Sequence, residues 1–567
     1  MLLENILKQI KEHQDQIAYT VNSKRYTYKE FYKYVCNIYW LLLEKNNKQK
    51  PVLVYGHKDV YMKATFLACS LAGMAYIPVD VSFPEDRINK IIDEVNPDLI
   101  IGNFENKLAK TITQTEIEKL MDKDNFKDIE KIYLKPEDVY YIIFTSGSTG
   151  IPKGVQVTYK NLDSCINWLQ EIIDVKEGTV LNQGVFSFDL TVADLYYSLA
   201  NGLEHFVIEK QTQSDFNKLF ETLKSSNATL AVFTPSFADL LLLDKSFNQE
   251  TMPNLKTILF CGEKLLAGTA KKIQERFKNI KIINSYGPTE CTFAVTSIEI
   301  TQKMIEENDI PIGIPKSDVK IYIVDEKLQE QKDGDTGEIL ITGKSVAKGY
   351  IGENKGKFIT YKGENAYLTG DIGYFKNDKL YYVARKDKQI KYKGYRIELL
   401  DIEENLYKLG YVEKAVAVAK QNKEGKVTKI IAFIKLKENA IKNEIEIKND
   451  ISTKLPQYMC PTIKIIERFP LNRNGKIDEK KLIEGWEVKK MKDKIIDIIE
   501  EVSGYENLRE NLDVDLLQNE ILDSLAFIEL ISTLNDEFNI EIQPTQVKPE
   551  TWRNVDKIVE LVKSLQQ

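Results

Sequence analysis

The segment from Thr145 to Gly154 carries the strongest chemical signal in the chain. It reads Thr-Ser-Gly-Ser-Thr-Gly-Ile-Pro-Lys-Gly and follows an apolar run, 139–144, that is typical of a buried strand. Its glycines let the backbone approach an anion closely, and its hydroxyls and lysine supply donors for phosphate oxygens. It is not a Walker A loop, in which Ser or Thr follows the lysine, and flexible linkers rarely follow a buried strand directly. We therefore predict a phosphate-binding loop made by Thr145, Ser146, Gly147, Ser148, Thr149, Gly150 and Lys153.

Four more segments with the residue types of a nucleotide site follow along the chain. They are Asn284-Ser285-Tyr286-Gly287-Pro288-Thr289-Glu290, Tyr367-Leu368-Thr369-Gly370-Asp371, the charged run 385–398, and Pro470-Leu471-Asn472-Arg473-Asn474-Gly475-Lys476-Ile477-Asp478. Glu290 offers the carboxylate that hard Mg²⁺ prefers beside phosphate oxygens, and Asp371 offers a carboxylate for ribose hydroxyls. Taken singly, each segment is also typical of a turn or of a solvated charged surface.

In this order the five segments resemble the motifs of the adenylate-forming enzymes, which include acyl-CoA synthetases, luciferases and the adenylation domains of peptide synthetases. The resemblance implies ATP and Mg²⁺ as cofactors. It implies that Tyr286 stacks on adenine, that Thr289 contacts the α-phosphate and that Glu290 binds the metal. It further implies a ribose contact from Asp371, a ribose or phosphate contact from Arg385, a hinge at Asp387, a catalytic charge from Lys476, catalytic roles for Thr145 and Arg385, and nucleotide contacts from Asn284, Gly287 and Pro288. One departure is Ala384, because the family usually has Gly before the arginine.

The segment Phe186-Ser187-Phe188-Asp189-Leu190 resembles the substrate-binding motif of family members that activate amino acids. There the aspartate pairs with the ammonium group of the substrate, and a buried carboxylate needs such a partner charge. Acyl-CoA synthetases generally lack an acid at this position. The resemblance therefore implies an amino acid substrate bound by Asp189 and Leu190. The alternative is that Asp189 only caps the helix that follows.

Residues 490–567 form an acidic tail, with 8 Lys and Arg against 17 Asp and Glu, a net charge of −9 in a chain whose total is −7. Apolar residues recur there at helical spacing, which predicts a small helical bundle. The tail carries Leu522-Asp523-Ser524-Leu525, which resembles the attachment site for 4′-phosphopantetheine in carrier proteins. A serine at a helix N-terminus suits a phosphodiester, although the same residues are also a common helix cap. We predict attachment at Ser524 and docking of this acidic module on basic surfaces.

The alternation of strands and helices over residues 1–300 predicts parallel sheets covered by helices, an α/β fold that binds ligands beyond the carboxyl ends of its strands. The expected strands are 51–55, 99–102, 139–144, 229–233, 257–260 and 281–283, and expected helices include 216–224 and 265–277. By resemblance, the fold is that of the adenylate-forming enzymes. It would comprise a large N-terminal lobe over residues 1–386, a small α+β C-terminal lobe over 387–485, a linker over 486–491 and an all-α carrier domain over 492–567.

Composition argues against several other classes of protein. In these 567 residues no apolar run approaches the length of a membrane-spanning helix, and the first residues lack the pattern of a signal peptide. The six cysteines form no Cys-x-x-Cys pair and the three histidines lie at no metal-ligand spacing, so we expect reduced thiols, no structural zinc and a cytoplasmic location. A nearly neutral body with an acidic tail argues against nucleic-acid binding.

A closer resemblance extends along the whole chain to the D-alanine–D-alanyl carrier protein ligases and, in the tail, to their separate carrier proteins. The segments that carry it are Val52–His57, Tyr76–Asp80, Leu181–Gln183, Thr234–Phe237, Phe260–Glu263 and, in the tail, Asp536–Ile540 with Trp552. The departure is that both parts occupy one chain here. The resemblance implies that Cys261 lies beside the α-carbon of the substrate and helps to select its D form.

The resemblance implies that the chain activates D-alanine as D-alanyl-AMP and transfers it to the phosphopantetheine thiol of its own carrier domain, for D-alanylation of teichoic acids. It also implies a phosphopantetheinyl transferase and a downstream membrane acyltransferase as partners. Two alternatives stay open. One is a peptide-synthetase didomain that activates another small amino acid, and the other is a non-catalytic carrier or sensor module. Retention of Lys153, Glu290, Asp371 and Lys476 disfavours the second.

Overall fold

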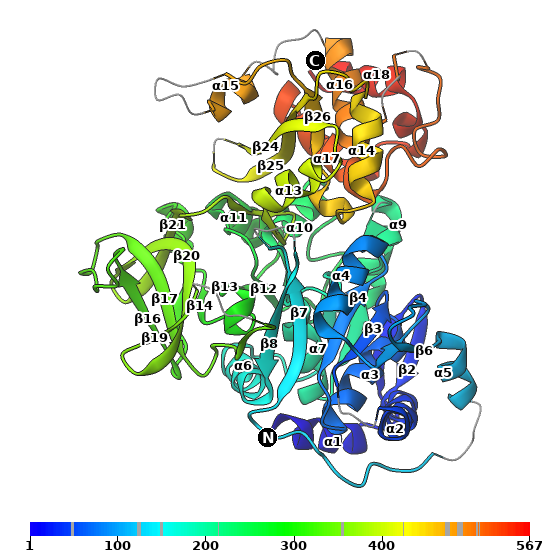
Figure 1. The fold of residues 1–567 in the computed structure, drawn as a ribbon, viewed down its shortest axis with the longest axis vertical. Helices are drawn as coiled ribbons and strands as arrows, with labels where there is room; N and C mark the ends of the chain where they lie inside the picture. The colour runs from blue at the N-terminus through cyan, green and yellow to red at the C-terminus, as the bar shows by residue number, and fades with distance from the viewer. Residues whose placement is uncertain are drawn as a thin grey trace.

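The computed structural model describes residues 1–46, 50–121, 126–147, 151–213, 215–352, 357–422, 424–470, 477–484, 491–505, 508–509 and 511–566. Two large sheets flanked by helices build the N-terminal lobe, in the lower part of Figure 1. The first sheet has the order β15-β14-β13-β12-β11-β9-β10-β1-β2, and the second has the order β18-β8-β7-β4-β3-β5-β6. Most neighbours in both sheets are parallel, as the alternation of strands and helices predicts.

The strands of the first sheet are β1 (Ile17–Val21), β2 (Lys24–Thr27), β9 (Thr179–Asn182), β10 (Glu204–Val207), β11 (Leu230–Phe233), β12 (Thr257–Phe260), β13 (Lys281–Tyr286), β14 (Thr296–Glu299) and β15 (Ile314–Pro315). Those of the second are β3 (Val52–Gly56), β4 (Tyr76–Asp80), β5 (Leu99–Ile101), β6 (Lys110–Ile112), β7 (Val139–Thr145), β8 (Lys153–Thr158) and β18 (Gly349–Tyr350). The helices of this lobe are α1 (Leu2–Glu12), α2 (Tyr28–Lys45), α3 (Val60–Leu71), α4 (Glu85–Val95), α5 (Gln114–Met121), α6 (Tyr159–Ile172), α7 (Leu190–Ala200), α8 (Lys210–Gln213), α9 (Phe216–Ser226), α10 (Pro235–Leu242), α11 (Ala267–Arg276), η1 (Thr289–Cys291) and α12 (Gln302–Glu306).

The predicted strands and helices of this lobe are confirmed, with ends that differ by a few residues. The largest difference is in β13, which continues through Asn284 to Tyr286 and so takes the start of the second motif into the sheet. Every residue of α3 and α7 is buried, since one apolar cluster joins these helices to strands of both sheets. The residues before α7 are thereby held at a fixed place in the core.

A third, antiparallel sheet is absent from the sequence prediction. It has the order β16-β17-β20-β19, with β21 paired to β20; its strands are β16 (Val319–Val324), β17 (Gly337–Gly343), β19 (Phe358–Tyr361), β20 (Glu364–Lys376) and β21 (Lys379–Arg385). The pairing of β17 with β20 shifts register between Leu368 and Ile372, which marks a bulge. Gly370 in the bulge has φ +76°, and a Cβ there would lie 2.7 Å from the Arg385 guanidinium. Glycine at this position therefore lets Asp371 and Arg385 approach each other.

The C-terminal lobe begins with a hairpin and continues as a three-stranded sheet with helices. Its elements are β22 (Gln389–Tyr392), β23 (Tyr395–Glu398), α13 (Leu399–Tyr407), β24 (Val412–Gln421), β25 (Val427–Leu436), α14 (Glu444–Ser452), η2 (Gln457–Met459), β26 (Thr462–Ile465) and α15 (Glu479–Glu484). The two-residue turn of the hairpin, Lys393-Gly394, has φ +51° and +83°, as a type I′ turn requires. A Cβ on Gly394 would lie 2.6 Å from the side chain of Thr234, so this glycine lets the turn pack against the N-terminal lobe.

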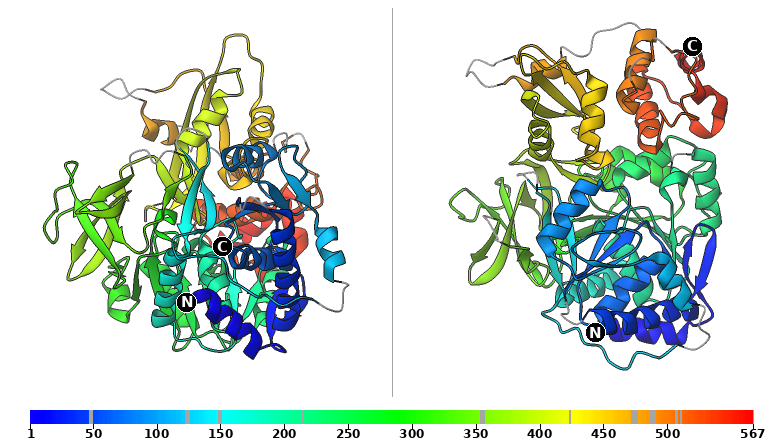
Figure 2. Two further views of the ribbon diagram at one scale, coloured as in Figure 1. Left: turned by 60° about the horizontal axis from the view of Figure 1, so that its bottom comes forward. Right: turned by 45° about the vertical axis from the view of Figure 1, so that its right-hand side comes forward.

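A helical module follows the C-terminal lobe. It consists of α16 (Met491–Ser503), α17 (Ser524–Phe538), η3 (Pro544–Gln546), η4 (Pro549–Arg553) and α18 (Val555–Gln566), as the apolar periodicity predicts. Most of the expected linker, 486–491, lies outside the described residues. In the right-hand view of Figure 2 the module stands beside the C-terminal lobe and above the N-terminal lobe. None of the described helices is both long and apolar enough to cross a membrane.

The helical module contacts both lobes. Lys393 at the tip of the hairpin pairs with Glu529 of α17 at 3.2 Å, and Lys429 of β25 pairs with Glu501 of α16 at 2.7 Å. On the N-terminal lobe the rings of Phe216 and Phe527 lie 5.8 Å apart. Lysines of the C-terminal lobe thus meet acids of the module within this chain, whereas the predicted docking on basic surfaces of partners stays a prediction.

Reversing the charge of Lys393 should weaken this docking, and reversing Glu529 as well should restore it. Both side chains are mostly shielded from solvent, so we expect a coupling of roughly 1 kcal/mol, or about fivefold in the docking equilibrium. The measurement is energy transfer between dyes on the module and on the N-terminal lobe in Lys393→Glu, Glu529→Lys and the double variant. If the effects of the two single changes add in the double variant, the Lys393–Glu529 pair does not stabilise the interface.

Candidate active site

The phosphate-loop segment connects two antiparallel strands. Thr145 ends β7 and is paired with Lys153, which begins β8. Ser146 and Gly147 follow β7, whereas Ser148, Thr149 and Gly150 lie outside the described residues. The loop leaves the carboxyl end of β7, at the edge of the sheet where α/β folds bind ligands. The structure therefore places this motif where the sequence predicts it.

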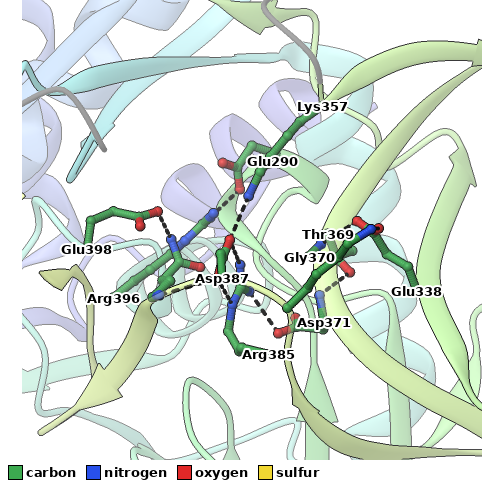
Figure 3. Close-up of polar contacts among 12 residues, drawn as sticks. Glu290, Glu338, Lys357, Thr369, Gly370, Asp371, Arg385, Asp387, Arg396 and Glu398 are labelled. Atoms are coloured by element: carbon green, nitrogen blue, oxygen red, sulfur yellow. Dashed lines mark hydrogen bonds and ion pairs between the residues drawn. The ribbon is translucent and has the colours of Figure 1, made fainter. Parts of the chain in front are cut away.

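Tyr286, Asp371 and Arg385, which the sequence placed at the ribose and base, lie together in the structure. The Tyr286 hydroxyl donates to Asp371 Oδ2 at 2.6 Å, and Arg385 Nη1 donates to Asp371 Oδ1 at 2.8 Å. Arg385 also pairs with Asp387 at 2.7 Å, so it lies between two carboxylates, as Figure 3 shows. Burial opposes ionisation of Asp387, but Arg385 and Lys357 hold its pKa well below its usual range. The expected hinge residue is thus an ionised anchor for Arg385 in this state.

Glu290 lies in η1 and is completely buried. Its Oε1 accepts from the Tyr350 hydroxyl at 2.5 Å. Its Oε2 is 2.5 Å from Arg396 Nη1, and Figure 3 shows Glu290 and Arg396 together. Burial would raise the pKa of Glu290, yet Arg396 and the hydrogen bond from Tyr350 lower it to about 2. A buried carboxylate that stays ionised fits a Mg²⁺ ion bound together with phosphate oxygens. In this structure Arg396 supplies the positive charge that pairs with Glu290.

Asp189 lies at the N-terminus of α7 and does not cap the helix, because its side chain accepts no hydrogen bond from the first turn. Burial raises the pKa of Asp189 to about 6, although a hydrogen bond with Thr289 opposes the rise. Cys261, directly after β12, is buried and close enough to Asp189 for that charge to raise the pKa of its thiol further, to about 11. Asp189 therefore contacts Thr289 of the second motif, next to Glu290, and the buried Cys261 lies within reach of its charge.

Two predicted residues cannot be placed fully. Lys476 and the side chain of Ser524 lie outside the described part of the chain. The backbone of Ser524 begins α17, and the Asp523 side chain accepts from the N–H groups of Leu525 and Ala526, so the N-cap is Asp523. The helix start is therefore where a carrier serine is expected, without the serine itself serving as the cap.

The sequence prediction did not identify Arg396 or Lys391 as site residues. Lys391 Nζ lies 5.4 Å from the centre of the Tyr286 ring, and Arg396 reaches Glu290, both from the β22–β23 hairpin. Ser146 ties the hairpin to the phosphate loop, since its hydroxyl donates to Arg396 O at 3.0 Å and accepts from Glu398 N at 3.2 Å. The sequence feature that could have indicated them is the alternation of cations with apolar residues in 389–398. This alternation puts Lys391 and Arg396 on one face of a hairpin.

Models of three protein families match the chain. The AMP-binding enzyme model covers residues 6–351, the AMP-binding enzyme C-terminal domain covers 401–476, and the phosphopantetheine attachment site covers 493–562. The first of these matches spans more than half of the chain and contains the phosphate loop and Glu290. The chain therefore belongs to the AMP-binding enzyme family. It is an enzyme that uses ATP and Mg²⁺ and has a module for 4′-phosphopantetheine, as the sequence predicts.

Among curated proteins, the chain is similar to the D-alanine–D-alanyl carrier protein ligases of Bacillus licheniformis and Bacillus cereus. Each is 39% identical, over 497 and 504 residues respectively, which is 85% of this chain and 99% of the relative. These relatives are aligned over nearly their full length, so this chain contains additional sequence.

Solved structures share the fold. A holo nonribosomal peptide synthetase protein with adenylation and PCP domains matches with a TM-score of 0.79 at 20% identity, covering 100% of this chain and 96% of that one. An artificially fused adenylation–PCP didomain from Klebsiella oxytoca matches with a TM-score of 0.71 at 18% identity, covering 99% and 98%. The adenylation domain AlmE of Vibrio cholerae matches with a TM-score of 0.72 at 23% identity, covering 85% and 97%. The expected fold, two adenylation lobes followed by a helical carrier module, is thereby confirmed.

A ligand whose ammonium group pairs with Asp189 should bind less tightly as the pH falls through about 6. Because its pKa is raised to about 6, this carboxyl is mainly ionised above pH 6 and mainly protonated below it. The affinity for the ammonium group should therefore fall by about tenfold for each further pH unit below 6. Calorimetric titration with small amino acids across this range measures the effect, and Asp189→Asn should bind weakly and without the pH dependence. Affinity that stays constant from neutral pH to well below 6 would contradict the assignment.

Proposed function

We propose that the chain activates D-alanine as D-alanyl-AMP and transfers it to the phosphopantetheine thiol on its own carrier module. The buried carboxylate of Asp189, hydrogen-bonded to Thr289 next to Glu290, carries the proposal, because it suits a ligand that has an ammonium group and reacts at phosphate. The curated relatives that name D-alanine support the choice of substrate. We also propose the boundaries 1–386, 387–485, 486–491 and 492–567 for the two lobes, the linker and the carrier domain.

In the first half-reaction, the carboxylate of the amino acid attacks the α-phosphorus of ATP and pyrophosphate leaves. We propose that Asp189 orients the ammonium group, that Asp371 and Arg385 hold the ribose, and that the phosphate loop and Lys153 hold the phosphates. Mg²⁺ at Glu290 would neutralise the charge of the leaving pyrophosphate. Lys476 would stabilise the negative charge that builds at phosphorus, and Thr145 would help to hold the phosphates for this step.

The same site offers a means to tell D-alanine from L-alanine. Cys261 is buried within reach of the Asp189 charge, and we propose that a substrate held by its ammonium group brings its α-carbon and methyl group against the thiol. Its neighbour Gly262 has φ +93° and faces the hairpin turn, where a Cβ would lie 3.7 Å from Gly394 O. We propose that contact with the Cys261 thiol makes one enantiomer fit better than the other.

D-alanine should support faster ATP–pyrophosphate exchange than L-alanine, and Cys261→Ala should narrow the difference. A steric contact of this size is worth about 1–3 kcal/mol, or roughly 10- to 200-fold in kcat/KM. The measurement is exchange with both alanine enantiomers and a panel of other small amino acids. Faster exchange with another amino acid would favour the peptide-synthetase alternative, and no exchange with any would favour the non-catalytic one.

The position of the carrier module supports transfer within one chain. The Leu525 carbonyl is 3.5 Å from Lys393 Nζ at the hairpin tip, and three residues later Arg396 contacts Glu290. The start of α17 therefore contacts the same hairpin whose Arg396 reaches Glu290. A cavity of about 370 Å³ adjoins it, lined by Ser82, Tyr392, Lys448, Asp523 and Ala526, and we propose it as the entrance for the arm on Ser524. When attached to Ser524, the 4′-phosphopantetheine arm supplies the thiol that accepts the acyl group.

Loading should occur within one chain and depend on Ser524. Ser524→Ala should retain pyrophosphate exchange but take up no covalent alanine, because only the acceptor is lost. A tethered acceptor is present at an effective concentration of about millimolar, so the loading rate per molecule should not change on dilution. In a mixture of Lys476→Ala and Ser524→Ala chains, the first should be charged far more slowly than the unmodified enzyme. Equal rates would show transfer between chains.

The remaining assignments concern the cellular setting. We propose that a phosphopantetheinyl transferase modifies Ser524 and that a membrane acyltransferase receives the D-alanyl group for teichoic acids. The relatives' name supports only the D-alanyl carrier. The six cysteines are free in the structure, which supports a reducing, cytoplasmic location. Radiolabelled D-alanine followed in intact cells that lack this gene product would test the link to teichoic acids.

A further inference from the structure

The β22–β23 hairpin presents two cations side by side to the nucleotide site. Its register pairs Lys391 directly with Arg396. Like charges opposite each other on one face of a hairpin destabilise it unless anions compensate them. Glu290 compensates Arg396, whereas Lys391 forms no ion pair with any residue that the structure describes. A second anion between the two cations, such as the phosphate of a nucleotide, would complete the compensation.

Arg396 has a hydrogen-bond donor left for such an anion. Nη1 donates to Glu290, and Nη2 lies 3.5 Å from the Tyr367 hydroxyl. Nε is buried and has no hydrogen-bond partner among the described residues. The main chain of Arg396 is bonded to Ser146 of the phosphate loop. Arg396 therefore contacts Glu290 through its guanidinium and the phosphate loop through its main chain.

Arg396 and Mg²⁺ compete for the same carboxylate. Tyr350 engages one oxygen of Glu290 and Arg396 engages the other. Each oxygen keeps a further lone pair, but the positive charge of Arg396 beside it disfavours a metal ion on the same carboxylate. The hairpin that bears Arg396 also bears Lys393, which contacts the docked carrier module. Arg396 is thus in place at Glu290 in the same arrangement in which the carrier is docked.

We propose that Arg396 replaces Mg²⁺ as the counter-charge at Glu290 when the carrier docks, and that it then stabilises the AMP that leaves during acyl transfer. This role rests on the proposed function. In that step the acyl carbon gains a bond to the thiol sulfur and loses its bond to the phosphate oxygen. AMP departs with the electron pair of the broken bond, and the thiol proton goes to water. The negative charge grows on the phosphate, next to the free Nε of Arg396, after Mg²⁺ and pyrophosphate have left.

The test separates the two half-reactions in Arg396→Gln. The holoenzyme first forms the adenylate, a chelator then removes Mg²⁺, and transfer to Ser524 is followed in a single turnover. Removal of one such donor is expected to slow transfer by about 10²- to 10³-fold. Transfer should fall more than adenylate formation by the same variant, and Arg396→Lys should retain part of the rate.

Adding back Mg²⁺ distinguishes a direct role from a structural one. In Arg396→Gln, Mg²⁺ can return to Glu290 and should restore transfer by about tenfold, whereas the unmodified enzyme should not respond. Lys435→Gln is the matched control, since it removes a partly exposed cation of the same lobe that pairs with Glu413 away from the site. Transfer by Arg396→Gln at the unmodified rate, or slow transfer that Mg²⁺ does not restore, overturns the proposal.

A binding measurement tests the competition between Arg396 and the metal even if acyl transfer to Ser524 cannot be observed. Calorimetric titration with Mg·ATP, without amino acid, should show roughly fivefold tighter binding to Arg396→Gln than to the unmodified enzyme, because the competing cation is gone. Equal or weaker binding overturns the competition. If no amino acid supports pyrophosphate exchange in the unmodified enzyme, the proposed function fails, and this titration still decides whether Arg396 competes with the metal.

Discussion

Three buried carboxylates at one edge of the N-terminal lobe determine how the rest of the structure is arranged. Asp189, Glu290 and Asp371 are all removed from water, and each needs a positive charge or hydrogen-bond donors to remain ionised. Asp371 has Arg385 and Tyr286, and Glu290 has Arg396 and Tyr350. Burial raises the pKa of Asp189 because no cation is close enough to outweigh it. The site is therefore electrostatically incomplete at the position where the substrate ammonium group is proposed to bind.

One of the two compensating cations, Arg396, comes from outside the N-terminal lobe, which makes the site dependent on the second lobe. Arg385 precedes the hinge residue and Arg396 lies beyond it, so rotation near Asp387 would leave the first in place and carry the second away. The close contact of Gly394 with Thr234, and the 2.9 Å hydrogen bond from Gly394 N to Glu263, determine how deeply the hairpin enters. A side chain in place of Gly394 would therefore shift the hairpin and weaken the ion pair between Arg396 and Glu290.

The sequence was sufficient for features that depend on local pattern. Apolar runs of strand length predicted β3, β7, β11 and β12 correctly, and the motifs at Thr145 and Tyr286 lie at strand ends, as parallel sheets require. Features that depend on distant pairs were missed. Arg396 is 106 residues from Glu290, and no periodicity in either segment indicates that they meet. The bulge at Gly370 was missed for the same reason, because it arises where β20 pairs with the distant strand β17, and its φ of +76° favours glycine.

Docking of the carrier and orientation of the C-terminal lobe are energetically coupled, because the module contacts both lobes at once. Phe527 packs against Phe216 of the N-terminal lobe, while Glu529 pairs with Lys393 of the hairpin. Both contacts can form at the same time only when the hairpin is packed against Thr234 of the N-terminal lobe, as in this structure. Carrier binding therefore favours this hairpin position, and this hairpin position favours carrier binding by the same factor. Each contact can be weak, since the tether already supplies a high local concentration. Weak contacts also let the module leave after loading, which a carrier must do if its acyl group is to reach another protein.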